Sequence, residues 1–235
     1  MAFTRVQSTV LVDSNTATLA LTFATPPTVG NAVVIPVTAY RPSDLVFPGT
    51  CTDNQGNTYA AAVYRGVSRG AVVYYCAKLT ATGAPFTITI SLGSFTNIYS
   101  GAAVEIGGVG AGGLTVDQTV NNYSVGTPAS TPNTAPLSAA DILLVAACAI
   151  AAAESSITVE AVTPPWVQEY EDFSNPSGEG NTRILTAGLG ATPRALWAYA
   201  PTFAEAWSVL AAFKGAGAAP PAAVERAETF INWPM

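Results

Sequence analysis

The sequence predicts an all-β protein, a jelly-roll-like antiparallel β-sandwich with a C-terminal extension. Apolar and polar residues alternate with a period of two along much of the chain, which is typical of strands with one buried face. Gly, Pro, Asn, Asp and Ser interrupt these stretches at intervals of about 8–12 residues, the spacing of short strands in a sandwich or barrel. No segment sustains the apolar repeat of a long amphipathic helix.

The expected strands follow from these patterns in chain order. Residues 18–23 alternate small or polar side chains with apolar ones. Residues 32–37 and 72–76 are denser apolar runs, which favour strands buried on both faces. The alternation returns at residues 86–92, and dense apolar runs follow at 142–148 and 209–213.

A weak internal echo relates residues 19–39 to residues 127–150. Each segment reads as a strand, a proline-containing turn and then a strongly apolar strand. Two similar halves suit a doubled Greek key, which is the jelly-roll arrangement. We therefore expect one sandwich domain over residues 1–214.

The C-terminal extension divides into two parts. Residues 215–223 are Gly, Ala and Pro only, the composition of a linker. Residues 224–235 form a docking tail that carries Phe230, Ile231 and Trp233. Large apolar side chains on a tail act as anchors when they enter a pocket. The tail is expected either to fold back on its own domain or to anchor on a neighbouring subunit.

The composition disfavours an enzyme. The chain has no histidine and is 10% charged, whereas an ordinary soluble domain carries about 25% charged residues. Without histidine, Ser-His-Asp and Cys-His catalytic arrangements and the common zinc sites are excluded. We expect a non-enzymatic protein with no cofactor and no metal, whose function is surface contact.

Charge and hydropathy also restrict the partners. The net charge of −6 argues against nucleic acid as a partner. The longest apolar run, residues 142–153, is shorter than the 20 or so residues that a membrane span requires. The N-terminal residues lack the apolar stretch of a signal peptide. We therefore expect neither nucleic acid nor a membrane as a partner.

Acidic residues gather in one stretch, which we expect at an exposed edge. Residues 154–179 contain six acids and no base. A solvated loop, a divalent-ion site, a contact with a basic neighbour and a carboxylate pair like that of a glycosidase all fit this stretch. Trp197 and Trp207 lie in alternating apolar stretches and are expected in the core. The expected exposed aromatic and acidic edge consists of Trp166, Glu169, Glu171 and Asp172.

The cysteines and one polar turn leave structural alternatives. Cys51, Cys76 and Cys148 show no metal-binding spacing, so we expect buried thiols. A bridge between Cys51 and Cys76 stays open. The segment 53–59 is expected to be a hairpin turn, with a calcium loop as the alternative.

Several motifs, taken in order, resemble the jelly-roll domains of tailed-phage virion structural proteins. They are Arg5-Val-Gln-Ser8, Thr25-Pro-Pro-Thr-Val-Gly30-Asn31, Asp53-Asn-Gln-Gly56-Asn57-Thr-Tyr59, Tyr74-Tyr75-Cys-Ala-Lys78 and Ala103-Val-Glu105-Ile. The resemblance covers roughly residues 4–214. The chain departs from the family at Ile106-Gly107-Gly108, where the family often has a Tyr-Ser-Gly step.

The resemblance implies a structural role in a virion assembled in the host cytoplasm. The leading expectation is a capsid decoration or cement protein. Its partners would be the major capsid protein or other virion proteins and its own copies, in a homo-oligomer that analogy makes a trimer. The alternative is a carbohydrate-binding, receptor-binding module of a tail or fibre protein, with a glycan as the partner.

Overall fold

A computed structural model describes residues 2–40, 47–93, 97–151, 156–173, 177–200 and 204–216. Its regular elements are all β-strands, paired antiparallel throughout, which confirms the predicted fold class. Among these residues there is no helix that is long and apolar enough to cross a membrane.

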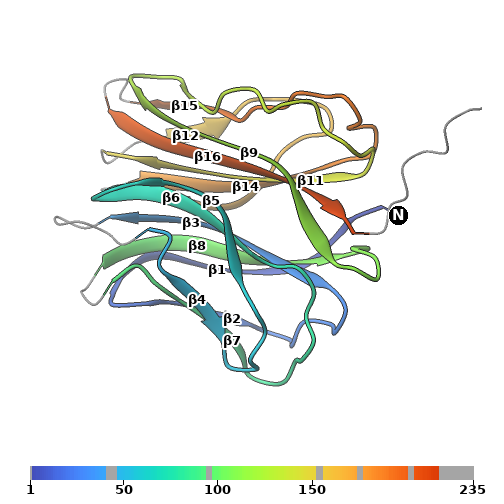
Figure 1. Ribbon diagram of the computed structural model, residues 1–235. Helices are drawn as coiled ribbons and strands as arrows, with labels where there is room; N and C mark the ends of the chain where they lie inside the picture. The colour runs from blue at the N-terminus through green and yellow to red at the C-terminus, as the bar shows by residue number, and fades with distance from the viewer. Residues whose placement is uncertain are drawn as a thin grey trace, which may run out of the picture.

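The strands form four sheets stacked in layers (Figure 1). The first half of the chain builds two of them, at the bottom of the stack. Sheet A contains, in spatial order, β1 (Thr4–Thr16), β8 (Asn97–Gly107), β3 (Ala32–Tyr40), β6 (Arg69–Cys76) and β5 (Ala60–Gly66). Sheet B, the lowest layer, contains β2 (Leu19–Phe23), β7 (Phe86–Ser91) and β4 (Thr50–Asp53).

The second half builds the two upper layers with the same topology. Sheet C contains β9 (Leu114–Val125), β16 (Glu205–Gly215), β11 (Ile142–Ile150), β14 (Ser177–Leu185) and β13 (Val167–Asp172). Sheet D contains β10 (Ala129–Ser130), β15 (Leu196–Ala200) and β12 (Ser156–Val159). Adding eight to each strand number of sheets A and B gives the strand orders of sheets C and D. The two halves are therefore a structural duplication.

The halves pack through their large sheets with approximate two-fold symmetry. Strand β5 lies against β9 and β16, and its equivalent β13 lies against β1 and β8. Strands β3 and β11, which are equivalent, lie against each other. Exchanging each strand for its equivalent reproduces the contacts, as in the isologous interface of a symmetric dimer.

Three apolar cores fill the spaces between the layers. The central core, between sheets A and C, contains Val34, Val104, Val145 and Phe213. The lower core lies between sheets A and B, and the upper core lies between sheets C and D. Strands β3 and β11 contribute to two cores each. This position explains why residues 32–37 and 142–148 are apolar on both faces.

The echo seen in the sequence corresponds to equivalent strands. Residues 19–39 include β2 and β3, and residues 127–150 include β10 and β11. The sequence interpretation assigned the two segments to halves of one sandwich. In the structure each segment belongs to a complete eight-stranded sandwich of its own.

The C-terminal segments are described only in part. Gly215 ends β16, and the Ala216 N–H donates to the carbonyl of Gly113 at 2.7 Å, so the first two residues of the predicted linker belong to the folded part. Residues 217–235, with Phe230, Ile231 and Trp233, lie outside the described residues. The predicted boundaries of linker and tail stay predictions.

One local expectation is corrected, and one open alternative is decided in favour of the expected free thiols. Segment 53–59 is not a hairpin turn, because β4 belongs to sheet B and β5 to sheet A. All three cysteines are free, so Cys51 and Cys76 are not bridged. Cys76 lies in the lower core and Cys51 packs against it, and burial raises the pKa of both thiols.

Candidate functional site: a groove between β5 and β9

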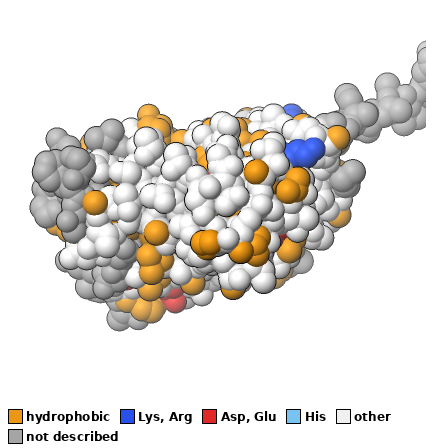
Figure 2. Space-filling view, turned by 90° about the horizontal axis from the view of Figure 1, so that it is seen from below, with side chains coloured by type: hydrophobic (Ala, Val, Ile, Leu, Met, Phe, Trp, Pro, Cys, Tyr) orange, Lys and Arg blue, Asp and Glu red, His pale blue; other side chains and the backbone are white. Residues whose placement is uncertain are grey.

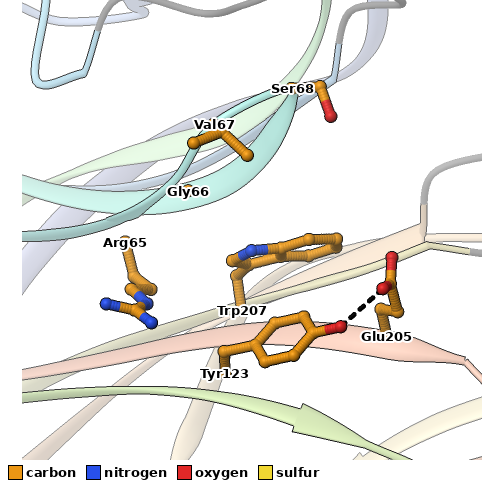
Figure 3. A pocket seen from close by; sticks show the side chains of 7 residues that line it. All are labelled: Arg65, Gly66, Val67, Ser68, Tyr123, Glu205 and Trp207. Atoms are coloured by element: carbon orange, nitrogen blue, oxygen red, sulfur yellow. Dashed lines mark hydrogen bonds between the residues drawn. The ribbon is translucent and has the colours of Figure 1, made fainter.

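A shallow concavity of the described residues runs between the edge strands of sheets A and C. Two adjoining hollows of about 500 and 480 Å³ share Arg65 and Gly66. We call this concavity the β5–β9 groove. Its walls are the β5–β6 hairpin on one side and β9 with β16 on the other (Figure 3).

Close contacts between glycines shape the rim of the groove. Gly66 has a φ of 150°, and a Cβ there would lie 2.2 Å from the carbonyl oxygen of Arg69. A Cβ on Gly70 would lie 2.3 Å from the carbonyl oxygen of Arg65. A side chain at either position would therefore open the hairpin and move Arg65, so the sequence needs glycine at both.

Two aromatic rings form the floor of the groove. The rings of Tyr123 and Trp207 lie 5.5 Å apart at an angle of 54°. Trp207 is nearly buried, as expected from the sequence, whereas Tyr123 is 38% exposed. The Tyr123 hydroxyl donates to Glu205 Oε1 (Figure 3). This hydrogen bond raises the pKa of Tyr123 above its usual value.

Polar groups without partners surround these rings. The Arg65 guanidinium makes no hydrogen bond or ion pair within the described part of the chain. Thr119 and Asn121 project from β9 into the neighbouring hollow, and both are exposed. An exposed aromatic face beside a free cation, an amide and hydroxyls is a set of groups that can stack on and hydrogen-bond a polar ring.

The two-fold equivalent of the groove is closed. It lies between β1 and β13, where Arg5 Nη2 and Nε donate to the Glu169 carboxylate, each at 2.9 Å. Thr182 Oγ1 donates to Glu169 Oε1 at 2.6 Å. A bulge between Gln168 and Tyr170 accommodates Glu169 and directs its side chain toward Arg5. The two edges thus share a topology but differ in their chemistry.

The aromatic and acidic edge expected from the sequence is not an exposed edge. Trp166 is only 8% exposed, and Glu169 and Asp172 are buried. Glu169 pairs with Arg5, and Asp172 Oδ2 accepts a hydrogen bond from Ser100 Oγ. Glu171 is half-buried. These acids are buried because β13 packs against β1 and β8 of the other half, which the sequence did not predict.

Trp166 belongs to the upper core. The connection from β12 to β13 crosses from sheet D to sheet C, and Trp166 closes the edge of the core there. The Arg183 guanidinium lies 5.8 Å from the centre of the ring. A sugar therefore has no access to Trp166, and the expectation of an exposed aromatic there is wrong.

Another acid of this stretch, Glu179, is buried without a cation among the described residues. Its Oε1 accepts from Asn181 Nδ2 at 2.7 Å, and its Oε2 has no partner. Burial, with a smaller effect of the Glu171 charge, raises the pKa of Glu179 to about 7. Glu171 and Glu179 lie opposite each other on β13 and β14. Because Glu179 is 1% exposed, this carboxylate pair offers no access to a substrate.

The motifs that carry the sequence resemblance form hydrogen bonds with one another and so stabilise the fold. The buried Glu105 carboxylate accepts hydrogen bonds from the Thr28 N–H at 2.8 Å, Asn31 Nδ2 at 2.6 Å and Gln7 Nε2 at 2.7 Å. One side chain therefore links three of the motifs.

The Asp53 turn is held in a similar way. The Asp53 carboxylate accepts from the N–H groups of Gln55 and Asn57 and from the Tyr59 hydroxyl. Both of its oxygens are used within the turn, which favours a structural role over a calcium loop. No group of three or more metal-ligating side chains of the usual kinds occurs among the described residues.

Comparison with known proteins identifies no relative: no family model, curated protein or solved structure matches this chain.

Proposed function

We propose that this chain is a non-enzymatic structural protein of a tailed-phage virion, a capsid decoration protein that binds the shell and its own copies. The observation that carries the proposal is the outer face of sheet B. Its inward side chains fill the lower core, and its outward ones are small, polar and uncharged. The outward residues are Ala20, Thr22, Thr50, Thr52, Thr87, Thr89 and Ser91, which the strand register places side by side.

This face has the character of an interface. Charged side chains are sparse on the side of the molecule that Figure 2 shows, from below the lowest layer of Figure 1. Interface cores are depleted in charged residues, because desolvating a charge and ordering a long side chain both cost free energy. Short threonine side chains on a three-stranded sheet lose little conformational freedom on contact. The order of the sequence motifs supports the virion setting.

A charge placed on sheet B tests the proposal. Thr52→Glu puts a carboxylate on the outer face of β4, and Thr158→Glu is the matched control at the equivalent position of β12. Both residues are exposed, so both variants should fold with stability within about 0.5 kcal/mol of the parent. We expect Thr52→Glu to reduce co-sedimentation with phage particles that lack the protein, and Thr158→Glu to bind like the parent chain. Equal binding by all three proteins would remove sheet B as the docking face.

A carbohydrate-binding function is the second candidate, and the β5–β9 groove is the observation that favours it. Tyr123 supplies an exposed ring, and Arg65 supplies free donors beside it. Stacking on an aromatic ring combined with donors to hydroxyl groups would suit a sugar ring. Tyr123 takes the place of Trp166 as the candidate aromatic residue for sugar binding, because Trp166 is buried.

A glycan array tests the second candidate. The full chain should bind at least one immobilised oligosaccharide, and Tyr123→Ala should lower the affinity about tenfold, the equivalent of 1.4 kcal/mol. Phe173→Ala, which removes an exposed ring that lines neither hollow of the groove, is the control and should bind normally. An array without a hit, or equal binding by Tyr123→Ala, would reject a sugar site in this groove.

A further inference from the structure

Strand β1 is a long edge strand of sheet A. It is 13 residues long and pairs on one side with β8, and no described strand pairs with its other side. No charged residue or proline occurs between Val6 and Val12. Four aliphatic side chains are well exposed: Val6 at 51%, Val10 at 52%, Leu11 at 37% and Val12 at 43%.

The other edge strands of sheets A and C carry charged residues along their length. Strand β5 carries the exposed Arg65 and has a bulge between Ala61 and Val63. Strand β13 has only six residues, three of them acidic. Strand β9 carries Asp117 and the exposed polar residues Thr119 and Asn121. Charges, bulges and shortness are the usual protections against edge-to-edge pairing. Strand β1 has bulges between Arg5 and Gln7 and between Leu11 and Ser14, but the stretch from Gln7 to Leu11 pairs with β8 without interruption and carries no charge.

The chain leaves the described fold close to the start of this edge. Gly215, the last residue of β16, lies near the Phe3 ring, since a Cβ at Gly215 would be 4.0 Å from Phe3 Cζ. Phe3 immediately precedes β1. Residues 217–235 continue from this point and include Thr229-Phe230-Ile231-Asn232-Trp233. β-Branched and aromatic residues of this kind favour strands.

We propose that residues 229–233 pair with the free edge of β1 in the same chain and so add a sixth strand to sheet A. The added strand would satisfy the outward N–H and C=O groups of β1 and cover part of Val10, Leu11 and Val12. This proposal does not depend on a virion role, because it concerns how the chain completes its own sheet.

The intervening chain is long enough for this contact. Residues 217–228 can span roughly 40 Å when extended, and the whole of β1 is about 43 Å long. A short flexible connection gives the segment an effective concentration on the order of millimolar at the edge. The same chain is therefore favoured over a neighbouring copy at ordinary protein concentrations.

Hydrogen exchange followed by mass spectrometry tests the pairing. Residues 2–216 contain every described strand and all three cores, so a chain that ends at Ala216 keeps the whole described fold. We expect the amides of β1 to exchange about tenfold faster in this shortened chain than in the full chain, because an open edge leaves its outward N–H groups unprotected. The amides of β9, the equivalent edge, should exchange at the same rate in both.

A full-length variant separates pairing from truncation. Phe230→Asp combined with Ile231→Asp should expose β1 as the truncation does, and Glu225→Asp is the conservative control. Equal β1 exchange in the full, shortened and variant chains would overturn the proposal. Protection of β1 that disappears on dilution, together with an oligomer in sedimentation, would also overturn it, because the strand would then come from another copy.

Discussion

The carboxyl group of Glu179 lies at the end of the upper core, and one of its two oxygens has no hydrogen-bond partner. Asn181 Nδ2 donates to one of its oxygens, and Asn181 Oδ1 accepts from Trp197 Nε1 at 3.0 Å. Cys148 and Ser208 occupy the same row on the next strands, and Ser208 Oγ is also buried without a partner. The neutral form of Glu179 suits this environment better than the anion, because burial without a cation penalises charge.

The contribution of Glu179 to the stability of the protein should therefore fall as pH rises from about 4.5 to about 7. The pKa of Glu179 lies near 7 in the folded protein, above its ordinary 4.5. Between these values the folded state holds a proton that the unfolded state releases, so rising pH favours unfolding. The contribution is fully present below pH 4.5 and is lost by about pH 7, with a total of about 3 kcal/mol.

Glu179→Gln should remove this loss, because glutamine resembles the protonated acid. Urea unfolding at pH 5 and pH 8 should show similar stability for variant and parent at pH 5, and a more stable variant at pH 8 by up to about 3 kcal/mol. Glu160→Gln, a half-buried acid in the same half, controls for the loss of one negative charge. The same fall in stability between pH 5 and pH 8 in parent and Glu179→Gln would contradict the assignment.

At the scale of elements, the contact between β1 and β13 and its equivalent, the β5–β9 groove, differ in the partner of their arginine. Arg5 on β1 donates two hydrogen bonds to the Glu169 carboxylate, whose side chain is fully buried, and this contact raises the pKa of Arg5. Arg65 on β5 lies at the open groove. The contact between β1 and β13 therefore contains an arginine–carboxylate pair, whereas the arginine of the β5–β9 groove has no carboxylate partner among the described residues.

Arginine substitutions should separate the two edges. Arg5→Gln leaves the Glu169 carboxylate buried without a cation and should cost about 3 kcal/mol of unfolding free energy. Arg65→Gln should change stability by less than about 0.5 kcal/mol. Denaturant unfolding of both variants measures the difference. Similar costs for the two variants would show that Arg5 and Glu169 do not hold β1 and β13 together.

Each strand that could be predicted from the sequence is buried on at least one whole face. Strand β14 is also buried but could not be predicted, because most of its residues are polar or glycine. Residues 86–92 alternate because β7 faces the lower core on one side and solvent on the other. Strands β5, β9 and β13 gave no clear pattern, because an edge strand packs against mixed surroundings and contains bulges or charges. The burial of the acids on β13 was missed for the same reason. Their partners Arg5 and Ser100 lie more than 70 residues away in sequence.

At the scale of the whole molecule, the site follows from the duplication. The sequence echo indicated two similar halves, but nothing in the sequence placed Arg65 beside Tyr123. These residues become neighbours only because sheets A and C pack about a two-fold axis. In the sequence Tyr123 is the middle residue of Asn122-Tyr123-Ser124, which matches a glycosylation acceptor and gives no sign of a groove. Its role at a groove required the packing of the two halves.

Two sandwiches in one chain also explain the scarcity of charge. A four-layer stack has three internal cores, so sheets A and C are covered on both faces. Strands such as β11 consequently have no solvent-facing positions for charged residues. The low charge of the strands in sheets A and C thus follows from their burial between layers. The outer face of sheet B is not covered by another layer, so burial does not explain why it is uncharged.

The central claim, that the protein coats a phage shell, is tested most directly by quantitative mass spectrometry of purified virions. The proposal predicts that the chain is present in intact particles at a copy number comparable with that of the major shell protein. Absence from the particles, or a copy number like that of tail proteins, would contradict a decoration role.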